Sequence, residues 1–131
     1  MQRRTYLKAA LAAAAGSPLL SAADAPKGRI QLHVDLTVPA AREKQMLQHF
    51  NTVFKPAASK QKGYISVDLL KLRSTLAGSA PQTANYRFIL VYDNEDLRQK
   101  WVASDVHQQV WPPMEKMLEH TKYNVLLYDY V

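Results

Sequence analysis

The feature that most constrains the fold is a strict alternation of apolar and polar residues that begins at Ile30. Apolar side chains occupy every second position as far as Val38, and His33 and Asp35 are among the polar residues between them. A period of two residues is typical of a strand with one buried face. The pattern therefore predicts a strand over residues 30–38 that packs one face against another layer.

A helical period follows this strand. Pro39 breaks the strand and suits a helix start, and an interior proline costs about 3 kcal/mol, so Pro56 should kink this helix or end its regular part. Gly63 then ends any helical segment that continues beyond Pro56. The apolar residues that recur at steps of three and four are Met46, Leu47, Phe50, Val53, Phe54 and Ala57.

The rest of the chain predicts two strands, a helical region and a last strand. Asp93 or Asn94 can cap the helical region, Ser104 starts a second helical stretch, and Pro112-Pro113 interrupts it again, so we expect a broken helix. The predicted strands cover residues 64–72, 86–92 and 123–131.

This order, β-α-β-β-α-β, predicts an α+β, ferredoxin-like unit: a four-stranded antiparallel sheet with both helices on one face. In the third strand, from Tyr86 to Tyr92, apolar residues occur in both of the alternating sets of positions, so both faces of the strand carry them. A second face that carries so much apolar surface should not stay exposed. We therefore expect a homodimer in which two sheets pack face to face and enclose a cavity, and we place Leu90 centrally on that face.

Residues 1–23 have the three parts of a signal peptide: basic residues, an Ala/Leu run and small residues. The segment from Arg3 to Lys8 resembles the twin-arginine export consensus. Ser21-Ala22-Ala23 fits cleavage before Asp24, which leaves residues 24–131 as the domain. We expect export to the periplasm or the extracellular space by the twin-arginine route, with no stable membrane span after the signal is removed.

Charge and cysteine content exclude several classes of protein. The net charge of +6 falls to +3 without residues 1–23, and Lys55, Lys60 and Lys62 have no interleaved aromatic residues, so nucleic-acid binding is not expected. The absence of cysteine excludes disulfides, thiolate metal sites and cysteine nucleophiles. No metal site is predicted.

Three segments carry a resemblance to a known family. They are Gly63-Tyr64 at the start of a strand, Phe88 to Tyr92 before a capped acidic turn, and Trp101 to His107. Together they resemble the antibiotic biosynthesis monooxygenase domain of the dimeric α/β barrel superfamily, over nearly all of residues 24–131. Members often use an Asn and a Trp on the third strand, where this sequence has Phe88 and Tyr92.

The resemblance implies a monooxygenase that oxidises a small phenolic or quinol substrate with O2 and needs no cofactor. The protein would bind, deprotonate and desolvate the substrate. Imidazole titrates near neutral pH, so His33 and His107 are the candidate bases, expected to meet in a cavity between the sheet and the broken helix. The candidate substrate-binding residues are Asp35, Phe88, Tyr92, Trp101 and Trp111.

Alternatives remain for the site and for the function. His33 and Asp35 could be ordinary polar residues of an exposed face, and the tryptophans could be core. The segment from Trp101 to Val106 also resembles the haem-degrading branch, although the position of its haem-ligating His falls on Trp111. A dimer that binds a small aromatic ligand without catalysis is a further alternative.

Overall fold

The computed structural model describes residues 28–80 and 84–131; the expected signal peptide and its cleavage site lie outside the described residues. The order of elements is the predicted one: a strand-helix-strand unit is followed by a second strand-helix-strand unit. The elements are β1 (Ile30–Leu36), α3 (Ala40–His49), the π-helix η1 (Phe50–Phe54), α4 (Lys55–Ala58), β2 (Tyr64–Lys71), β3 (Tyr86–Tyr92), α5 (Glu95–Ala103), α6 (Asp105–Glu115) and β4 (Asn124–Asp129).

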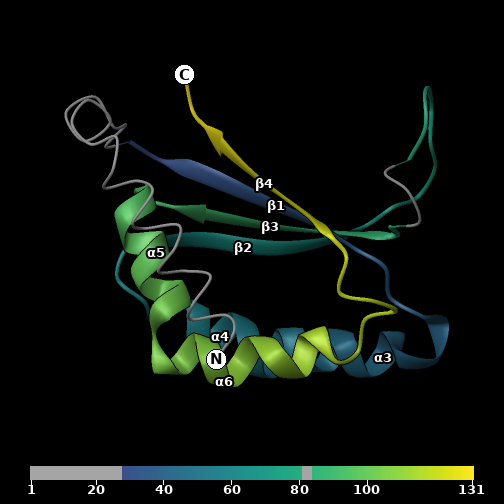
Figure 1. The fold of residues 1–131 in the computed structure, drawn as a ribbon, viewed down its shortest axis with the longest axis horizontal. Helices are drawn as coiled ribbons and strands as arrows, with labels where there is room; N and C mark the ends of the chain where they lie inside the picture. The colour runs from purple at the N-terminus through teal and green to yellow at the C-terminus, as the bar shows by residue number, and fades with distance from the viewer. Residues whose placement is uncertain (1–27, 81–83) are drawn as a thin grey trace.

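The four strands form one antiparallel sheet in the order β2-β3-β1-β4. All the helices lie on one side of it, with α3, α4 and α6 running beneath the sheet and α5 standing at one end (Figure 1). This arrangement confirms the predicted α+β, ferredoxin-like fold. We call the side of the sheet that faces away from the helices the open face.

The register of β1 and β3 decides which side chains meet the helices. Val34 pairs with Phe88 and Leu32 with Leu90, and all four side chains are buried on the helix side. Leu90 is only 2% exposed. Our expectation that Leu90 lies on the second face was therefore wrong, because its parity along β3 points it into the helix-sheet core.

The first helix changes its period just before Pro56. Lys55 donates its N–H to the carbonyl of Phe50, five residues back, so the segment from Phe50 to Phe54 is π-helical. Proline has no N–H and its ring clashes with the carbonyl four residues earlier. The wider turn therefore lies where an α-helix would meet that clash, and the predicted end of the regular part is confirmed.

The second helical region is broken once, at Ser104, and not again at Pro112-Pro113. Ser104 has extended backbone between α5 and α6, which confirms the first break. The proline pair lies inside α6, which runs on to Glu115, so the second expected break was wrong. Burial of Val110, Trp111 and Met114 in the core stabilises this stretch by several kcal/mol, on the order of the proline cost.

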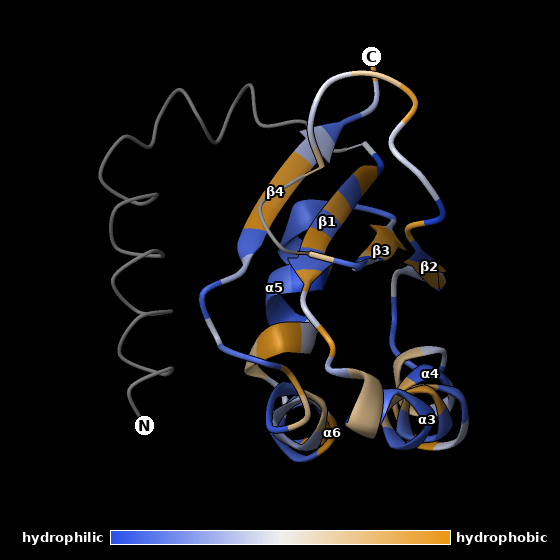
Figure 2. Ribbon diagram, turned by 90° about the vertical axis from the view of Figure 1, so that its right-hand side faces the viewer, coloured by the Kyte–Doolittle hydropathy of each residue, from blue (hydrophilic) through white to orange (hydrophobic). Residues whose placement is uncertain are grey.

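The open face and β4 carry apolar side chains that the described residues leave uncovered. Every residue of β4 is exposed, including Leu126 at 42% and Tyr128 at 49%. Figure 2 shows this hydrophobic strand at the edge of the sheet, beyond the helices. No helix within residues 28–80 and 84–131 has the length and apolar character needed to cross a membrane.

Candidate functional site

The sheet separates the predicted site residues into two groups. Phe88 and Tyr92 on β3 lie on the helix side, as do the buried indoles of α5 and α6. His33 and Asp35 have the opposite parity on β1 and lie on the open face. A single cavity that includes both His33 and His107 was therefore a wrong expectation, because the sheet lies between them.

His107 lies within a cluster of aromatic rings between α6 and the sheet. Its ring is 5.0 Å from that of Trp101, edge to face, and 6.3 Å from that of Trp111, nearly parallel. Trp111 in turn contacts Phe88 at 5.7 Å and Phe54 at 5.9 Å. We call these five residues the aromatic compartment.

Ser104 fixes the position of the compartment's imidazole. Its hydroxyl accepts a hydrogen bond from the backbone N–H of His107 at 3.2 Å and donates one to the carbonyl of Trp101 at 2.7 Å. Because one side chain caps α6 and closes α5, it sets the angle at which the two helices present Trp101 and His107 to the same space. The sequence signal for this arrangement was the predicted cap itself.

Tyr92 lies on the same side of the sheet, at the end of β3. It is fully buried, and its ring meets Tyr64 edge-on at 6.5 Å. Its hydroxyl has no hydrogen-bond partner among the described residues. Burial raises the pKa of Tyr92 to about 12, so this phenol stays neutral at physiological pH.

His33 has polar and aromatic neighbours on the open face. Its Nε2 is 2.5 Å from Oε1 of Gln31, and its ring lies 4.8 Å from that of Tyr128 on β4. Desolvation lowers the pKa of His33, and the positive charge of Arg87 lowers it further. The negative charge of Asp35 raises it, but by less. Neutral His33 is therefore the form that this face favours.

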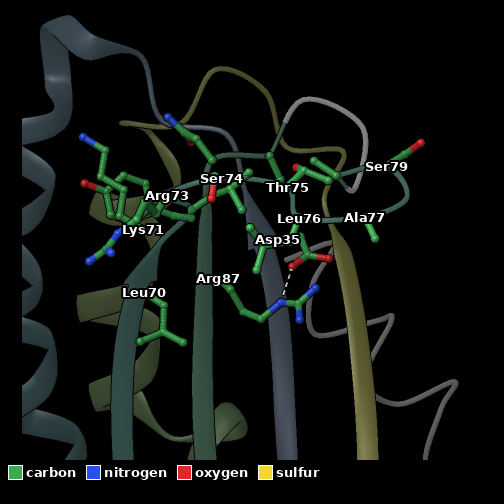
Figure 3. Close-up of a pocket in the computed structure, with 15 residues that line it drawn as sticks. Asp35, Leu70, Lys71, Arg73, Ser74, Thr75, Leu76, Ala77, Ser79 and Arg87 are labelled. Atoms are coloured by element: carbon green, nitrogen blue, oxygen red, sulfur yellow. Dashed lines mark hydrogen bonds and ion pairs between the residues drawn. The ribbon is translucent and has the colours of Figure 1, made fainter.

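Asp35 lies in a pocket that our sequence reasoning missed. Its carboxylate is 6% exposed and accepts a hydrogen bond from Nε of Arg87 at 2.8 Å. The pocket has a volume of about 440 Å³ and lies between the open face and the loop that joins β2 to β3 (Figure 3). The strand register could have predicted this ion pair, because Arg87 on β3 is the direct partner of Asp35 on β1.

The residues that the structure describes contain no group of three or more His, Cys, Asp or Glu side chains placed to hold a metal ion. The chemistry available within the described ranges is thus that of imidazole, phenol, indole, carboxylate and guanidinium groups.

Comparison with known proteins finds likeness in fold only. Neither a family model nor a curated protein matches the sequence. A dimeric ferredoxin-like protein of unknown function from Jannaschia is 11% identical, with a TM-score of 0.66 over 79% of this chain and 100% of that one.

Two solved structures with the same fold are described as oxygenases. SnoaB, a cofactor-independent oxygenase from Streptomyces nogalater, is 14% identical, with a TM-score of 0.63 over 79% of this chain and 94% of that one. A candidate antibiotic biosynthesis monooxygenase from Bordetella bronchiseptica is 16% identical, with a TM-score of 0.63 over 79% of this chain and 98% of that one. At such identities the shared property is the ferredoxin-like fold.

Proposed function

We propose that this protein is a monooxygenase of the antibiotic biosynthesis type that oxidises a small phenol or quinol with O2 and no cofactor. The observation that carries the proposal is the aromatic compartment around His107, where a titratable imidazole lies between two indole rings. Aromatic walls suit a flat phenolic substrate, and an imidazole suits the removal of its proton. The oxygenase descriptions of SnoaB and the Bordetella protein, which share this fold, support the same reaction class.

His107 is the base in this proposal, and His33 is not. Only an imidazole on the helix side can reach a substrate held by Trp101 and Trp111. His49 also lies on that side, but its Nε2 is 2.8 Å from the carbonyl oxygen of Val110, a contact that uses one ring nitrogen to join α3 to α6. His107 is partly exposed and takes the substrate proton.

The deprotonated substrate supplies the electrons for oxygen reduction. The phenolate or quinolate supplies all four electrons for the reduction of O2. One oxygen atom enters the ring, and the other leaves as water with two hydrogens from the substrate, so that a phenol becomes a quinone and a quinol becomes a hydroxyquinone. An apolar surrounding favours this step, because it removes the water that would stabilise the substrate anion. The walls of the aromatic compartment are hydrocarbon and ring surfaces, and Phe54, Phe88 and Trp101 are almost fully buried.

Substrate entry requires the aromatic rings to move. Centroid distances of 5.0 to 6.3 Å among these rings are those of direct contact, so the compartment is packed. A planar substrate would take the place of one ring. Because Ser104 is the single residue between α5 and α6, a shift of α6 would have to break its hydrogen bonds to Trp101 and His107. We therefore propose a small substrate, of one or two fused rings.

Haem does not fit the residues of the compartment. The macrocycle needs a flat space beside a ligating nitrogen. Here the rings of Trp101 and Trp111 flank the imidazole of His107, and the Nδ1 atom of His107 is buried. We derive no step through haem.

Self-association through the open face is part of the proposal. The face carries Ile89, Leu126 and Tyr128, and β4 is an exposed apolar edge strand, a combination that favours association with a second chain. The related Jannaschia structure is described as dimeric. A second copy of this chain, packed sheet to sheet, would cover both features at once.

Export remains a separate proposal that rests on residues 1–23. Replacing Arg3 and Arg4 together by Lys should leave unprocessed protein in the cytoplasm, because the twin-arginine route reads the pair. An unchanged yield of a form that begins near Asp24 would contradict this route.

Oxygen uptake by the purified protein, with a panel of phenols and quinols, tests the proposed reaction. We expect uptake that depends on both substrate and protein, in the presence of a chelator and without added flavin or haem. The product should gain one oxygen atom from labelled O2, as measured by mass spectrometry. Binding of the same compounds without oxygen uptake would instead support a non-catalytic ligand-binding protein.

A further inference from the structure

The pocket beside Asp35 is independent of the aromatic compartment. It lies on the opposite face of the sheet, and residues 72–77, 79 and 80, which follow β2, form part of its wall. Figure 1 shows the segment that follows β2 projecting away from the helices, beyond the end of the sheet. The proposed oxidation uses none of the residues that line this pocket. Ile89, Leu126 and Tyr128, which carry the proposed contact between two chains, do not line it either.

Hydrogen bonds hold the base of this loop on the sheet. The side chain of Asn85 accepts from the backbone N–H of Val38 at 2.8 Å and donates to the carbonyl of the same residue at 2.9 Å. The backbone of Asn85 adds a bond to Leu36 at 2.9 Å and receives one from Leu72 at 2.8 Å. The entrance and exit of the loop are therefore fixed relative to Asp35 and Arg87.

The ion pair at the floor of the pocket leaves part of Arg87 available. Asp35 binds Nε of Arg87, which fixes the plane of the guanidinium, and the side chain of Arg87 is 41% exposed. The contact with Asp35 runs through Nε, so Nη1 and Nη2 are not part of it. A guanidinium held in this way presents parallel N–H groups, a geometry that matches a carboxylate.

The rest of the lining is positively charged and partly aliphatic. Arg73 lines the pocket with Arg87, whereas Lys71 is already bound to Glu43 at 2.6 Å. The charges available to a ligand are thus two guanidinium groups against the single carboxylate of Asp35. The aliphatic part of the lining comes from Leu70, Leu72, Leu76 and Ala77.

We propose that this pocket binds a small organic carboxylate with an apolar body. The carboxylate pairs with Nη1 and Nη2 of Arg87, and the apolar body lies against Leu70 and the aliphatic loop residues (Figure 3). Asp35 is a positioning residue that orients Arg87. A volume of about 440 Å³ is sufficient for a ligand the size of a substituted benzoate.

Titration of the full-length chain with benzoate, followed by calorimetry or by ligand-detected NMR, tests this site. We expect benzoate to bind and benzyl alcohol, its uncharged analogue of similar size, to bind about ten-fold more weakly or not at all. Arg87→Gln should weaken benzoate binding about ten-fold or more, while Lys100→Gln, which removes a cation on α5, should not change it.

A second variant keeps the test valid if Arg87→Gln fails to fold. Asp35→Asn with Arg87→Gln removes both charges, so no buried carboxylate is left without its partner. This double variant should be folded by circular dichroism and should have lost the preference for benzoate. Equal affinity for benzoate and benzyl alcohol, no benzoate binding by the unmodified chain, or a preference that survives in the double variant would overturn the proposal. Oxygen uptake plays no part in this measurement, so the two proposals fail separately.

Discussion

At the residue scale, two buried tyrosines differ in one respect that can be measured. The hydroxyl of Tyr86 donates to Glu43 at 2.5 Å, whereas that of Tyr92 has no partner among the described residues. A buried polar group without a partner carries a desolvation cost that deletion removes. We predict that Tyr92→Phe leaves the free energy of unfolding unchanged or raises it by up to about 1 kcal/mol, whereas Tyr86→Phe lowers it by about 1–3 kcal/mol.

Urea denaturation of the two variants and the parent measures this difference. Both substitutions delete the same atom from a side chain that is at most 4% exposed, so each serves as the control for the other. A loss of 1 kcal/mol or more, on the scale of one net hydrogen bond, for Tyr92→Phe would mean that its hydroxyl is bonded, for example to a buried water.

The pKa of His33 predicts how stability depends on pH. Desolvation, followed by Arg87, holds the pKa of His33 below its usual value of 6.5 in the folded state, so the unfolded chain binds the proton more readily. The contribution of His33 to stability is then complete above pH 6.5, decreases as pH falls below that value, and levels off below the folded-state pKa.

The variant His33→Gln isolates this contribution from the other histidines. The difference in free energy of unfolding between the parent and His33→Gln should shift against the parent on going from about pH 7.5 to about pH 5.5. Urea titrations at both values measure it. A difference that stays constant, or that moves in favour of the parent at low pH, would show that His33 is not desolvated in the folded protein.

At the scale of elements, the glycine that directly precedes β2 lies against α5. Gly63 has a φ of +93°, and a Cβ atom there would lie 2.7 Å from Cδ1 of Leu97 on α5. Gly78 has a φ of +74° with nothing within 4 Å of the same position. Gly63→Ala therefore meets backbone strain and overlap, whereas Gly78→Ala meets strain alone.

We predict that Gly63→Ala destabilises the fold by about 2–5 kcal/mol and Gly78→Ala by about 1–2 kcal/mol. The midpoints of thermal or urea unfolding measure both. If the two variants lose equal stability, the close approach of α5 to the start of β2 is not a rigid contact.

Periodicity was sufficient to predict the elements but not all of their interruptions. The alternation in β1 and the helical spacing from Met46 to Ala57 depend on burial, which the sequence records directly. The alternation was confirmed, and the spacing was confirmed except at Val53, which is 41% exposed. The continuity of α6 through Pro112-Pro113 depends on the packing of Trp111 and Met114 against other elements. Local propensity therefore overestimated the effect of the two prolines.

The candidate site shows the same limit at longer range. Aromatic residues and the capping Ser104 were readable from the sequence, and the structure brings Trp101, His107 and Trp111 together. The sheet separates His33 from these three residues, and this depends on which face of β1 is covered by the helices. The pocket beside Asp35 depends on the path of a loop, for which no periodic signal exists.

At the scale of the whole molecule, the open face predicts association that one substitution can prevent. Ile89 lies on that face between Asp68 of β2 and His33 of β1, whereas its neighbour Leu90 is in the core. Ile89→Arg should give a folded single chain, because Arg on an uncovered face remains solvated but would be buried in a sheet-to-sheet dimer. Leu90→Arg should unfold the protein whatever its assembly state.

Light scattering at micromolar concentration, combined with circular dichroism, distinguishes these outcomes. The parent protein should have the mass of two chains, and Ile89→Arg the mass of one with unchanged secondary structure. A parent mass of one chain, or an Ile89→Arg variant that still has the mass of two, would contradict association through this face.

The central claim is that chemistry takes place on the helix side of the sheet, at His107. Oxygen uptake with the most active quinol of the panel, compared among the parent, His107→Gln and His33→Gln, tests it most directly. We predict a decrease in kcat of about 100-fold for His107→Gln with a smaller change in KM, since the loss of a general base acts on the proton-transfer step. His33→Gln should keep nearly the parent turnover. Full activity of a folded His107→Gln variant, or the loss of activity in His33→Gln alone, would contradict the account.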